Sequence, residues 1–309
     1  MSELRFNELR GEEVAYAIHR QDRTFLPDRA QCPLDPTRAG APKTEIPLEA
    51  FEIVVFDNRF PAFEAPVGAA EVVVYTDDHY GSFGLLAAER AEALMWVWRH
   101  RYEELGSRDD VDYVYIFENR GVEVGVTLHH PHGQIYGYPF VPPVAALERA
   151  ADERLGGCAP CVLIERERDA GTRLLLENEA VIGYVPEAAR WPFEAHVAML
   201  AHRRSLLDCD ARELQQLASA LQELVRGYDA LFARPMPYVM AVHQAPTIGG
   251  VGGHLSNEGH LHIEFYPPLR TAEKLKYLAG SEQGAGTFIG DVLPEEAAEQ
   301  LREAISRGG

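Results

Sequence analysis

Thr127-Leu128-His129-His130-Pro131-His132-Gly133-Gln134 is the stretch of this 309-residue chain from which its fold and chemistry are best predicted. Residues two apart in an extended segment face the same side, so we expect His130 and His132 to project together. Pro131 favours that extended backbone in the residue before it, and Gly133 lets a ligand approach the main chain closely. Gln134 adds amide N–H donors that suit a phosphate oxygen. The stretch therefore favours phosphoryl or nucleotidyl transfer by an imidazole, although metal ligation or a polar turn would also explain it.

The composition is that of a globular protein with one or two domains. Hydrophobic residues make up 46% of the chain and charged residues 25%, and no apolar run reaches the ~20 residues that span a bilayer. The first residues contain no apolar signal segment, so we expect a cytoplasmic location and no membrane partner. A net charge of −19 argues against nucleic acid as a partner, whereas small phosphorylated substrates need only a local cluster of Arg, Lys and backbone N–H groups.

The chain looks internally duplicated. The first half begins with a Cys-Pro-Leu-Asp segment (32–35), a strand-like run (51–56), a Pro-rich turn (58–66) and a second strand-like run (71–75). A helix (84–105), a third strand-like run (111–118) and the His-Pro-His stretch (130–132) follow. The second half repeats this order at residues 158–161, 180–185, 186–192, 196–200, 210–232, 238–243 and 260–265. His79 then corresponds to His202, and the pair His130/His132 to His260/His262.

We therefore predict an α+β fold with two tandem halves, residues 1–141 and 142–309. Hairpins dominate each half, so the sheet should be mostly antiparallel and flanked by helices. Residues 142–157 predict a helical linker, Asp210 an N-cap, and Pro294 the start of a C-terminal helix. The Gly-rich stretches 248–254 and 280–290 predict loops.

Cysteine and histidine positions predict two metal sites. In a cytoplasmic chain the four cysteines are expected to be thiols or metal ligands. The second site combines the C-x-x-C pair with two histidines that the repeat brings near it: Cys158, Cys161, His202 and His260. Two thiolates and two imidazoles form a typical structural zinc site, although the pair could simply be two buried thiols in a turn.

The first site has the same plan with one difference. Its residues are Cys32, Asp35, His79 and His130, so a carboxylate stands where the second cysteine is expected. A carboxylate oxygen can ligate zinc, and the site would then hold the strand carrying His132 in place. A site without metal is the alternative. His129 should point away from His130 in a regular strand.

Several motifs together resemble the galactose-1-phosphate uridylyltransferase family of the histidine-triad superfamily. They are His130-Pro131-His132-Gly133-Gln134, the segment 117–121 (Phe-Glu-Asn-Arg-Gly), the segments 5–7 and 19–23 before Cys32-Pro33-Leu34, the segment 55–61, and 265–270 (Phe-Tyr-Pro-Pro-Leu-Arg). The resemblance covers nearly the whole chain, and each motif alone is weak.

The resemblance implies a two-step exchange. His132 would attack the α-phosphorus of UDP-glucose, glucose 1-phosphate would leave, and galactose 1-phosphate would accept the uridylyl group. Gln134 would donate to a non-bridging oxygen, where charge develops. The resemblance also implies substrate contacts for Arg20, Arg23, Asn58, Asn119, Thr127, Lys276 and Glu282, zinc as the cofactor, and a homodimer.

Three positions depart from the family pattern. Asp35 replaces a cysteine, as described above. Glu148, His243 and His262 match three ligands of an iron site found in some members, but Glu264 stands in place of the last histidine, so we expect zinc at the C-x-x-C site instead and ordinary polar roles for Glu148 and His243. Lys276 and Glu282 fit hexose-contacting positions, but the family's following glutamine falls near Gly286-Thr287, which leaves the hexose open.

Four other functions fit parts of the pattern. A nucleotide-sugar phosphorylase would pass an adenylyl group from ADP-glucose to inorganic phosphate by the same histidine. A hydrolase with water as acceptor would have no use for a hexose pocket around Lys276 and Glu282. A non-catalytic nucleotide or metal sensor would not need His132 and Gln134 together. A nucleic-acid-binding zinc protein conflicts with the charge.

Overall fold

One nine-stranded sheet organises the chain in the computed structural model, which describes residues 3–40, 43–251 and 259–308. Its strand order is β3-β4-β6-β5-β10-β11-β9-β8-β7, and all neighbours are antiparallel. The strands are β3 (Val54–Asp57), β4 (Ala69–Val74), β5 (Tyr113–Arg120), β6 (His132–Tyr138), β7 (Leu174–Glu177), β8 (Val181–Tyr184), β9 (Ala195–Met199), β10 (Tyr238–His243) and β11 (His262–Tyr266). This confirms the predicted α+β class.

The strand order also displays the duplication. The first half contributes β3-β4-β6-β5, and the second contributes the corresponding strands in reverse order, β10-β11-β9-β8, with β7 added at the edge. β5 pairs with β10 at the centre, where Ala241 lies opposite Phe117. The two halves therefore share one continuous sheet, and the division at residue 141 stays a prediction.

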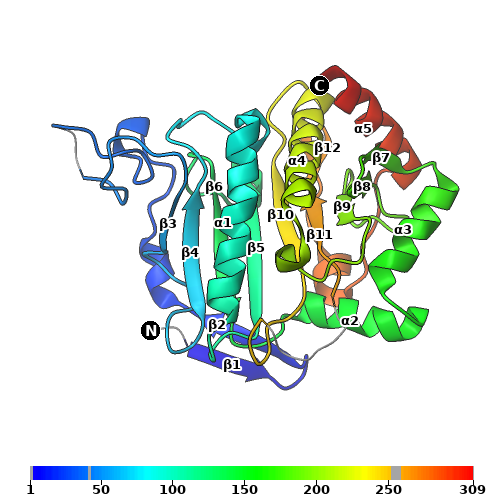
Figure 1. Cartoon of the computed structure of the whole chain (residues 1–309), viewed down its shortest axis with the longest axis horizontal. Helices are drawn as coiled ribbons and strands as arrows, with labels where there is room; N and C mark the ends of the chain where they lie inside the picture. The colour runs from blue at the N-terminus through cyan, green and yellow to red at the C-terminus, as the bar shows by residue number, and fades with distance from the viewer. Residues whose placement is uncertain (1–2, 41–42, 252–258, 309) are drawn as a thin grey trace.

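Long helices cover one face of the sheet, as Figure 1 shows for α1 (Ala88–Gly106) and α4 (Ala211–Leu231). α4 begins at a capping box in which Asp210 accepts from the Glu213 backbone N–H while the Glu213 carboxylate accepts from the Asp210 N–H, as predicted for this cap. Its apolar side is fully buried at Leu214, Leu221 and Leu224, against strand residues of the same core. α5 (Pro294–Gly308) packs on α4 through Leu301 and Ile305. The core between helices and sheet fixes the position of every strand that carries a site residue.

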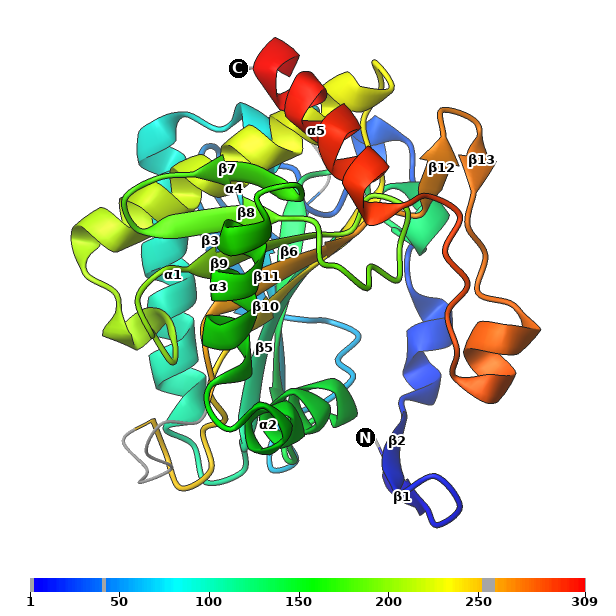
Figure 2. The same cartoon turned by 90° about the vertical axis from the view of Figure 1, so that its right-hand side faces the viewer.

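The other face of the sheet is only partly covered. α2 (Pro143–Leu155), the predicted linker helix, and α3 (Ala159–Ala170) lie over the second half. Figure 2 shows the hairpin of β1 (Glu3–Asn7) and β2 (Glu12–Tyr16), and the short strands β12 (Leu269–Thr271) and β13 (Lys274–Leu275), on the side opposite α1. No helix in the described ranges is both long and apolar enough to cross a membrane.

Some boundaries differ from the sequence predictions. α1 starts at Ala88 instead of residue 84 because Phe83–Leu85 forms a separate turn. Residues 280–290, predicted to be a loop, include a short helical segment at Gly280–Ala285. The predicted loop 248–254 extends beyond the described residues after Val251. The prediction that His130 and His132 share one strand is wrong, because β6 begins at His132.

Candidate functional site

His132 occupies the first position of β6, between two cavities. One cavity, of about 100 Å³, has Leu34, Phe56 and Val72 as its apolar wall. Its polar residues include four that the sequence predicted: Arg23, Asn58, Thr127 and Gln134. The second cavity, of about 630 Å³, also contains Asn119 and His130. A small apolar slot beside a polar rim suits a planar base with an attached phosphate. Phe56 and Val72 were missed as wall residues, although the motif around residues 55–61 points to Phe56.

The tautomer of His132 follows from its surroundings. Its Nδ1 lies 2.7 Å from the backbone oxygen of His130. A carbonyl oxygen only accepts, so Nδ1 carries the hydrogen and Nε2 carries the free lone pair. Burial lowers the pKa of this imidazole below its usual value, which keeps it neutral at pH 7. His132 therefore presents a nucleophilic nitrogen.

His130 precedes β6, and hydrogen bonds hold both nitrogens of its ring. It is 1% exposed, and its Nε2 lies 2.7 Å from the backbone oxygen of Thr76, next to the end of β4. Its Nδ1 lies 2.8 Å from Asp35 Oδ1, and so does Nδ1 of His79. These contacts join the segment before β6 to the Cys32 loop, and the predicted link through a metal ion stays a prediction.

Two groups of four side chains could hold a metal. The structure brings together Cys32, Asp35, His79 and His130, and separately Cys158, Cys161, His202 and His260. In the second group, Sγ of Cys161 lies 3.5 Å from His202 Nδ1 and 3.3 Å from His260 Nδ1. Ligands of one tetrahedral zinc ion with Zn–S and Zn–N bonds of usual length are about 3.5 Å apart. The donor set and spacing of this group therefore fit such an ion.

The environment of His260 supports the fit. Its Nε2 lies 2.8 Å from the Met199 carbonyl oxygen, so Nε2–H donates and the Nδ1 lone pair faces the thiols. Burial lowers the pKa of His260 to about 4, so the neutral form that ligates a metal is the stable one. Burial also raises the pKa of the Cys158 thiol to about 12, so its thiolate needs a cation beside it. In the first group, the hydrogen-bond distances of Asp35 show that this carboxylate reaches both imidazoles.

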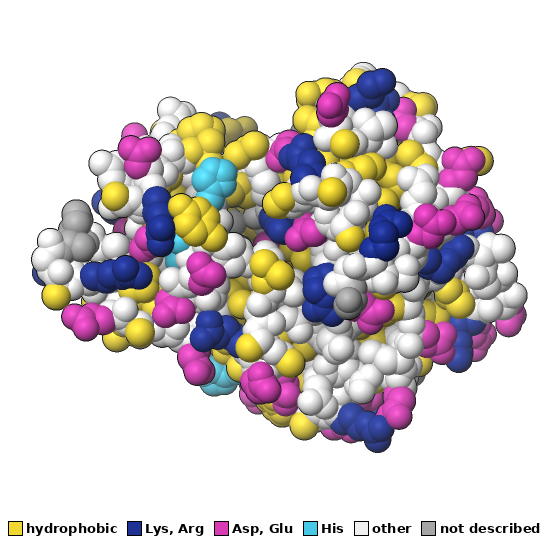
Figure 3. Space-filling model, turned by 90° about the horizontal axis from the view of Figure 1, so that it is seen from above, with side chains coloured by type: hydrophobic (Ala, Val, Ile, Leu, Met, Phe, Trp, Pro, Cys, Tyr) yellow, Lys and Arg dark blue, Asp and Glu magenta, His cyan; other side chains and the backbone are white. Residues whose placement is uncertain are grey.

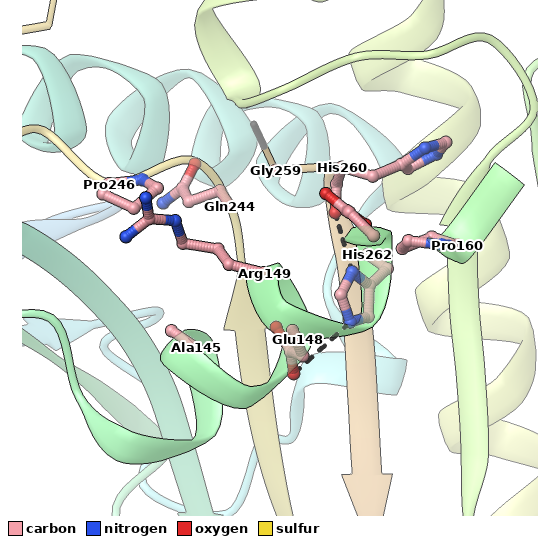
Figure 4. Close-up of a pocket in the computed structure, with 10 residues that line it drawn as sticks. Ala145, Glu148, Arg149, Pro160, Gln244, Pro246, Gly259, His260 and His262 are labelled. Atoms are coloured by element: carbon pink, nitrogen blue, oxygen red, sulfur yellow. Dashed lines mark hydrogen bonds and ion pairs between the residues drawn. The ribbon is translucent and has the colours of Figure 1, made fainter. Parts of the chain in front are cut away.

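A third group, Glu148, His243 and His262, also lies together. Figure 4 shows two of its members, Glu148 on α2 and His262 on the neighbouring strand, pointing toward each other. Glu148 Oε1 lies 2.9 Å from His243 Nδ1 and 4.0 Å from His262 Nε2. His262 Nε2 lies 3.5 Å from Glu264, the residue that stands at a histidine position of the resembled family. These contacts are compatible with a polar network that joins α2 to the sheet, and the same three side chains could also hold a metal ion. The ordinary polar role expected for Glu148 and His243 stays a prediction.

The predicted hexose contacts lie away from His132 in the same chain. Lys276 is buried, with its ammonium 3.7 Å from Glu282 and 3.7 Å from Asp291, and it donates to the Ile289 backbone oxygen. Neither Lys276 nor Glu282 lines the cavities beside His132. The structure of one chain therefore does not bring these two residues to the candidate nucleophile.

Gly133 is expected to tolerate no side chain. A Cβ there would lie 2.1 Å from the Tyr75 hydroxyl and 3.1 Å from the Phe117 carbonyl oxygen. Gly133→Ala should therefore displace β6. Overpacking of this kind costs about 1–3 kcal/mol, so the melting temperature should fall by several degrees. Differential scanning calorimetry measures the melting temperature. Gly290→Ala, where a Cβ meets nothing within 4 Å, is the matched control and should melt like the wild type; equal melting of both variants would contradict the packing described.

Comparisons with known proteins agree on one family. The profile of "Galactose-1-phosphate uridyl transferase, N-terminal domain" matches residues 57–142, and that of "Galactose-1-phosphate uridyl transferase, C-terminal domain" matches 159–307. Proteins named galactose-1-phosphate uridylyltransferase from Thermotoga maritima and Streptomyces lividans are each 37% identical to this chain, and each match covers 98% of it. The match covers 98% of the Thermotoga protein and 87% of the Streptomyces protein. A solved structure titled "Structure of uridylyltransferase" has a TM-score of 0.85 at 30% identity, and 99% of each chain is covered.

Proposed function

The chain belongs to the galactose-1-phosphate uridylyltransferase family, and on this premise we propose that His132 carries the uridylyl group as a covalent intermediate between UDP-glucose and galactose 1-phosphate. The observation that carries the proposal is the orientation of His132, whose Nδ1–H is held by the His130 carbonyl while Nε2 stays free at the cavity. That arrangement suits nucleophilic attack at neutral pH.

The two steps balance in atoms and charge. Nε2 of His132 attacks the α-phosphorus of UDP-glucose, the bond from that phosphorus to the bridging oxygen breaks, and glucose 1-phosphate leaves with the electron pair. A phosphate oxygen of galactose 1-phosphate then attacks the same phosphorus, the P–N bond breaks, and UDP-galactose leaves. Gln134 donates to a non-bridging oxygen in both steps, and Arg23, Asn58, Asn119 and Thr127 surround the nucleotide and its phosphates.

Intact-protein mass spectrometry after mixing the protein with UDP-glucose tests this proposal. We expect a uridylyl mass increment on the protein that galactose 1-phosphate discharges. An increment with ADP-glucose but not with UDP-glucose would favour the alternative, a nucleotide-sugar phosphorylase that uses inorganic phosphate as acceptor. No increment with either donor would overturn covalent catalysis. The relatives at 37% identity, named as uridylyltransferases, favour the first outcome.

We further propose that zinc is the metal of the group Cys158, Cys161, His202 and His260, and that it also occupies the group with Asp35. Two thiolates and two imidazoles prefer zinc among the abundant divalent ions, and an oxygen ligand in the other group is compatible with it. When bound, zinc would cross-link distant segments of the chain and take no part in the transfer. The Cys32 group would hold His130, two residues before the nucleophile, in place.

We also propose a homodimer in which Lys276 and Glu282 of one copy reach the hexose bound near His132 of the other. Exposed apolar side chains on two segments, residues 6–18 and 277–293, support an interface between the copies. They are Phe6, Leu9 and Ile18 in the first segment, and Tyr277, Ile289 and Leu293 in the second.

A cytoplasmic location stays a prediction from the sequence. On the face drawn in Figure 3, Lys and Arg side chains are interspersed with Asp and Glu rather than gathered in a basic patch, which agrees with a small-molecule substrate.

Mixing two inactive variants tests the shared site. His132→Gly and Lys276→Met chains should each be inactive alone, since each removes one component of every site. Refolded together at equal amounts, half of the dimers are hybrids with one intact site, so about a quarter of wild-type activity should return. No recovery, with hybrid dimers shown by native mass spectrometry, would mean that both residues act within one chain.

A further inference from the structure

The side-chain amide of Gln134 receives two hydrogen bonds on its oxygen. Asn58 Nδ2 lies 3.4 Å from Gln134 Oε1, and the Tyr136 hydroxyl lies 3.2 Å from the same atom. Gln134 and Tyr136 are two residues apart on β6, so their side chains share the face of the sheet that carries His132. An amide can be turned by 180° at little cost unless its neighbours distinguish oxygen from nitrogen.

The contact with Arg20 favours donation by the Tyr136 hydroxyl toward Gln134. Nη1 of Arg20 lies 3.2 Å from the Tyr136 hydroxyl and 3.0 Å from the Phe60 carbonyl oxygen. A guanidinium can only donate, so the tyrosine oxygen accepts from Arg20. The single hydroxyl hydrogen of Tyr136 is then free for Gln134 Oε1. With Arg20 at one acceptor position of the Tyr136 oxygen, donation of the hydroxyl hydrogen to Gln134 Oε1 satisfies both side chains.

Asn58 is oriented in the same way from the other side. Its Oδ1 accepts from the Phe60 backbone N–H at 2.9 Å, so its nitrogen faces Gln134. Two oriented donors therefore meet on one oxygen, and the Gln134 nitrogen with its two hydrogens points elsewhere. Gln134 and His132 line the same cavity, where the transferred phosphate would lie. A flipped amide would place an oxygen against a phosphate oxygen, which is repulsive.

We propose that Tyr136, held by Arg20, is a positioning residue that fixes the Gln134 amide with its N–H donors toward the transferred phosphate. The proposal rests on the uridylyl transfer proposed above. It also gives Arg20 a role different from the direct phosphate contact that the family resemblance implied, because the Arg20 Nη1 is engaged by the Phe60 carbonyl and the Tyr136 hydroxyl.

Tyr136→Phe removes the hydroxyl and keeps the ring. The ring is 7% exposed and packs edge-on against Phe117 and Phe63, so the variant should fold and melt like the wild type. The rate at which UDP-glucose adds a uridylyl group to His132, followed by quenched intact-protein mass spectrometry, should fall about tenfold, because a misoriented donor loses most of one charge-assisted hydrogen bond. The concentration of UDP-glucose that gives half the maximal rate should change little.

Tyr138→Phe is the matched control. Tyr138 lies two residues further along the same strand and face, and it packs on Phe63 and Phe140 without a hydrogen bond to Gln134. Tyr138→Phe also removes one hydroxyl, and it should leave the rate of uridylyl addition to His132 unchanged.

A double-mutant cycle distinguishes positioning from a general structural role. In a Gln134→Ala background, Tyr136→Phe should have no further effect, because the amide that it orients is absent. An unchanged rate in Tyr136→Phe, or an equal loss in both backgrounds, would overturn the positioning role and leave the covalent mechanism standing. No adduct on the wild type would overturn both.

Discussion

Replacement of His132 by glycine is expected to abolish the uridylyl adduct and to lower the rate of UDP-galactose formation by about 10⁴-fold or more. The imidazole is the one group in the described part of the small cavity with a free nucleophilic nitrogen, since Gln134, Asn58 and Arg23 offer only neutral amides or a cation there. Loss of a covalent nucleophile typically removes nearly all catalysis beyond substrate binding.

The measurement combines steady-state assay with intact-protein mass spectrometry. His129→Gly is the matched control: it makes the same exchange three residues earlier, at an exposed side chain outside the small cavity. That variant should form the adduct at the wild-type rate. If His132→Gly still acquired a uridylyl group, peptide mapping would identify another nucleophile and the mechanism would be wrong.

The second large effect is expected at the metal group on α3. Cys158→Ala removes one thiolate and should reduce the bound zinc by one ion per chain. The melting temperature should fall by about 5–10 °C, because the free energy of zinc binding no longer stabilises the folded state. The reason is geometric: Cys158 lies at the start of α3, whereas His260 precedes β11, 102 residues away in the sequence, and the metal would join these two segments.

Elemental analysis and thermal unfolding, each with and without a chelator, provide the measurement. The chelator should destabilise the wild type more than Cys158→Ala, because the variant can lose only the zinc of the Cys32 group. Cys209→Ala deletes a buried thiol outside both metal groups, so it should keep its zinc even if its cavity costs stability. A full zinc content in Cys158→Ala would remove this residue from the ligand set.

The predictions that succeeded depended on local patterns. Asp210 with Glu213 specifies a helix start within four residues, and the apolar run in residues 238–243 predicts β10 with its observed bounds. The duplication was visible because the same local elements occur twice in the same order. These signals require only neighbours in sequence, so they survive without knowledge of the fold.

Other elements had no such signal. The β1–β2 hairpin is mostly exposed, so it lacks an apolar period, and β7 is a short edge strand. α3 begins at the C-x-x-C pair itself, for which the sequence predicted metal ligands but no helix. The start of β6 at His132, and of β11 at His262, follows from tertiary contacts of the preceding histidines with the carbonyls of Thr76 and Met199.

The sequence by itself determined the family, and it predicted the two halves, the candidate nucleophile His132 and both candidate sets of metal ligands, because each depends on short motifs whose residue types carry the chemistry. Only the tertiary structure decided which residues orient those groups. The pairing of β5 with β10 joins the halves, Arg20 reaches Tyr136 across 116 residues, and Lys276 folds back on its own segment. Such contacts depend on how distant strands and loops pack, and no local pattern of side chains encodes that packing.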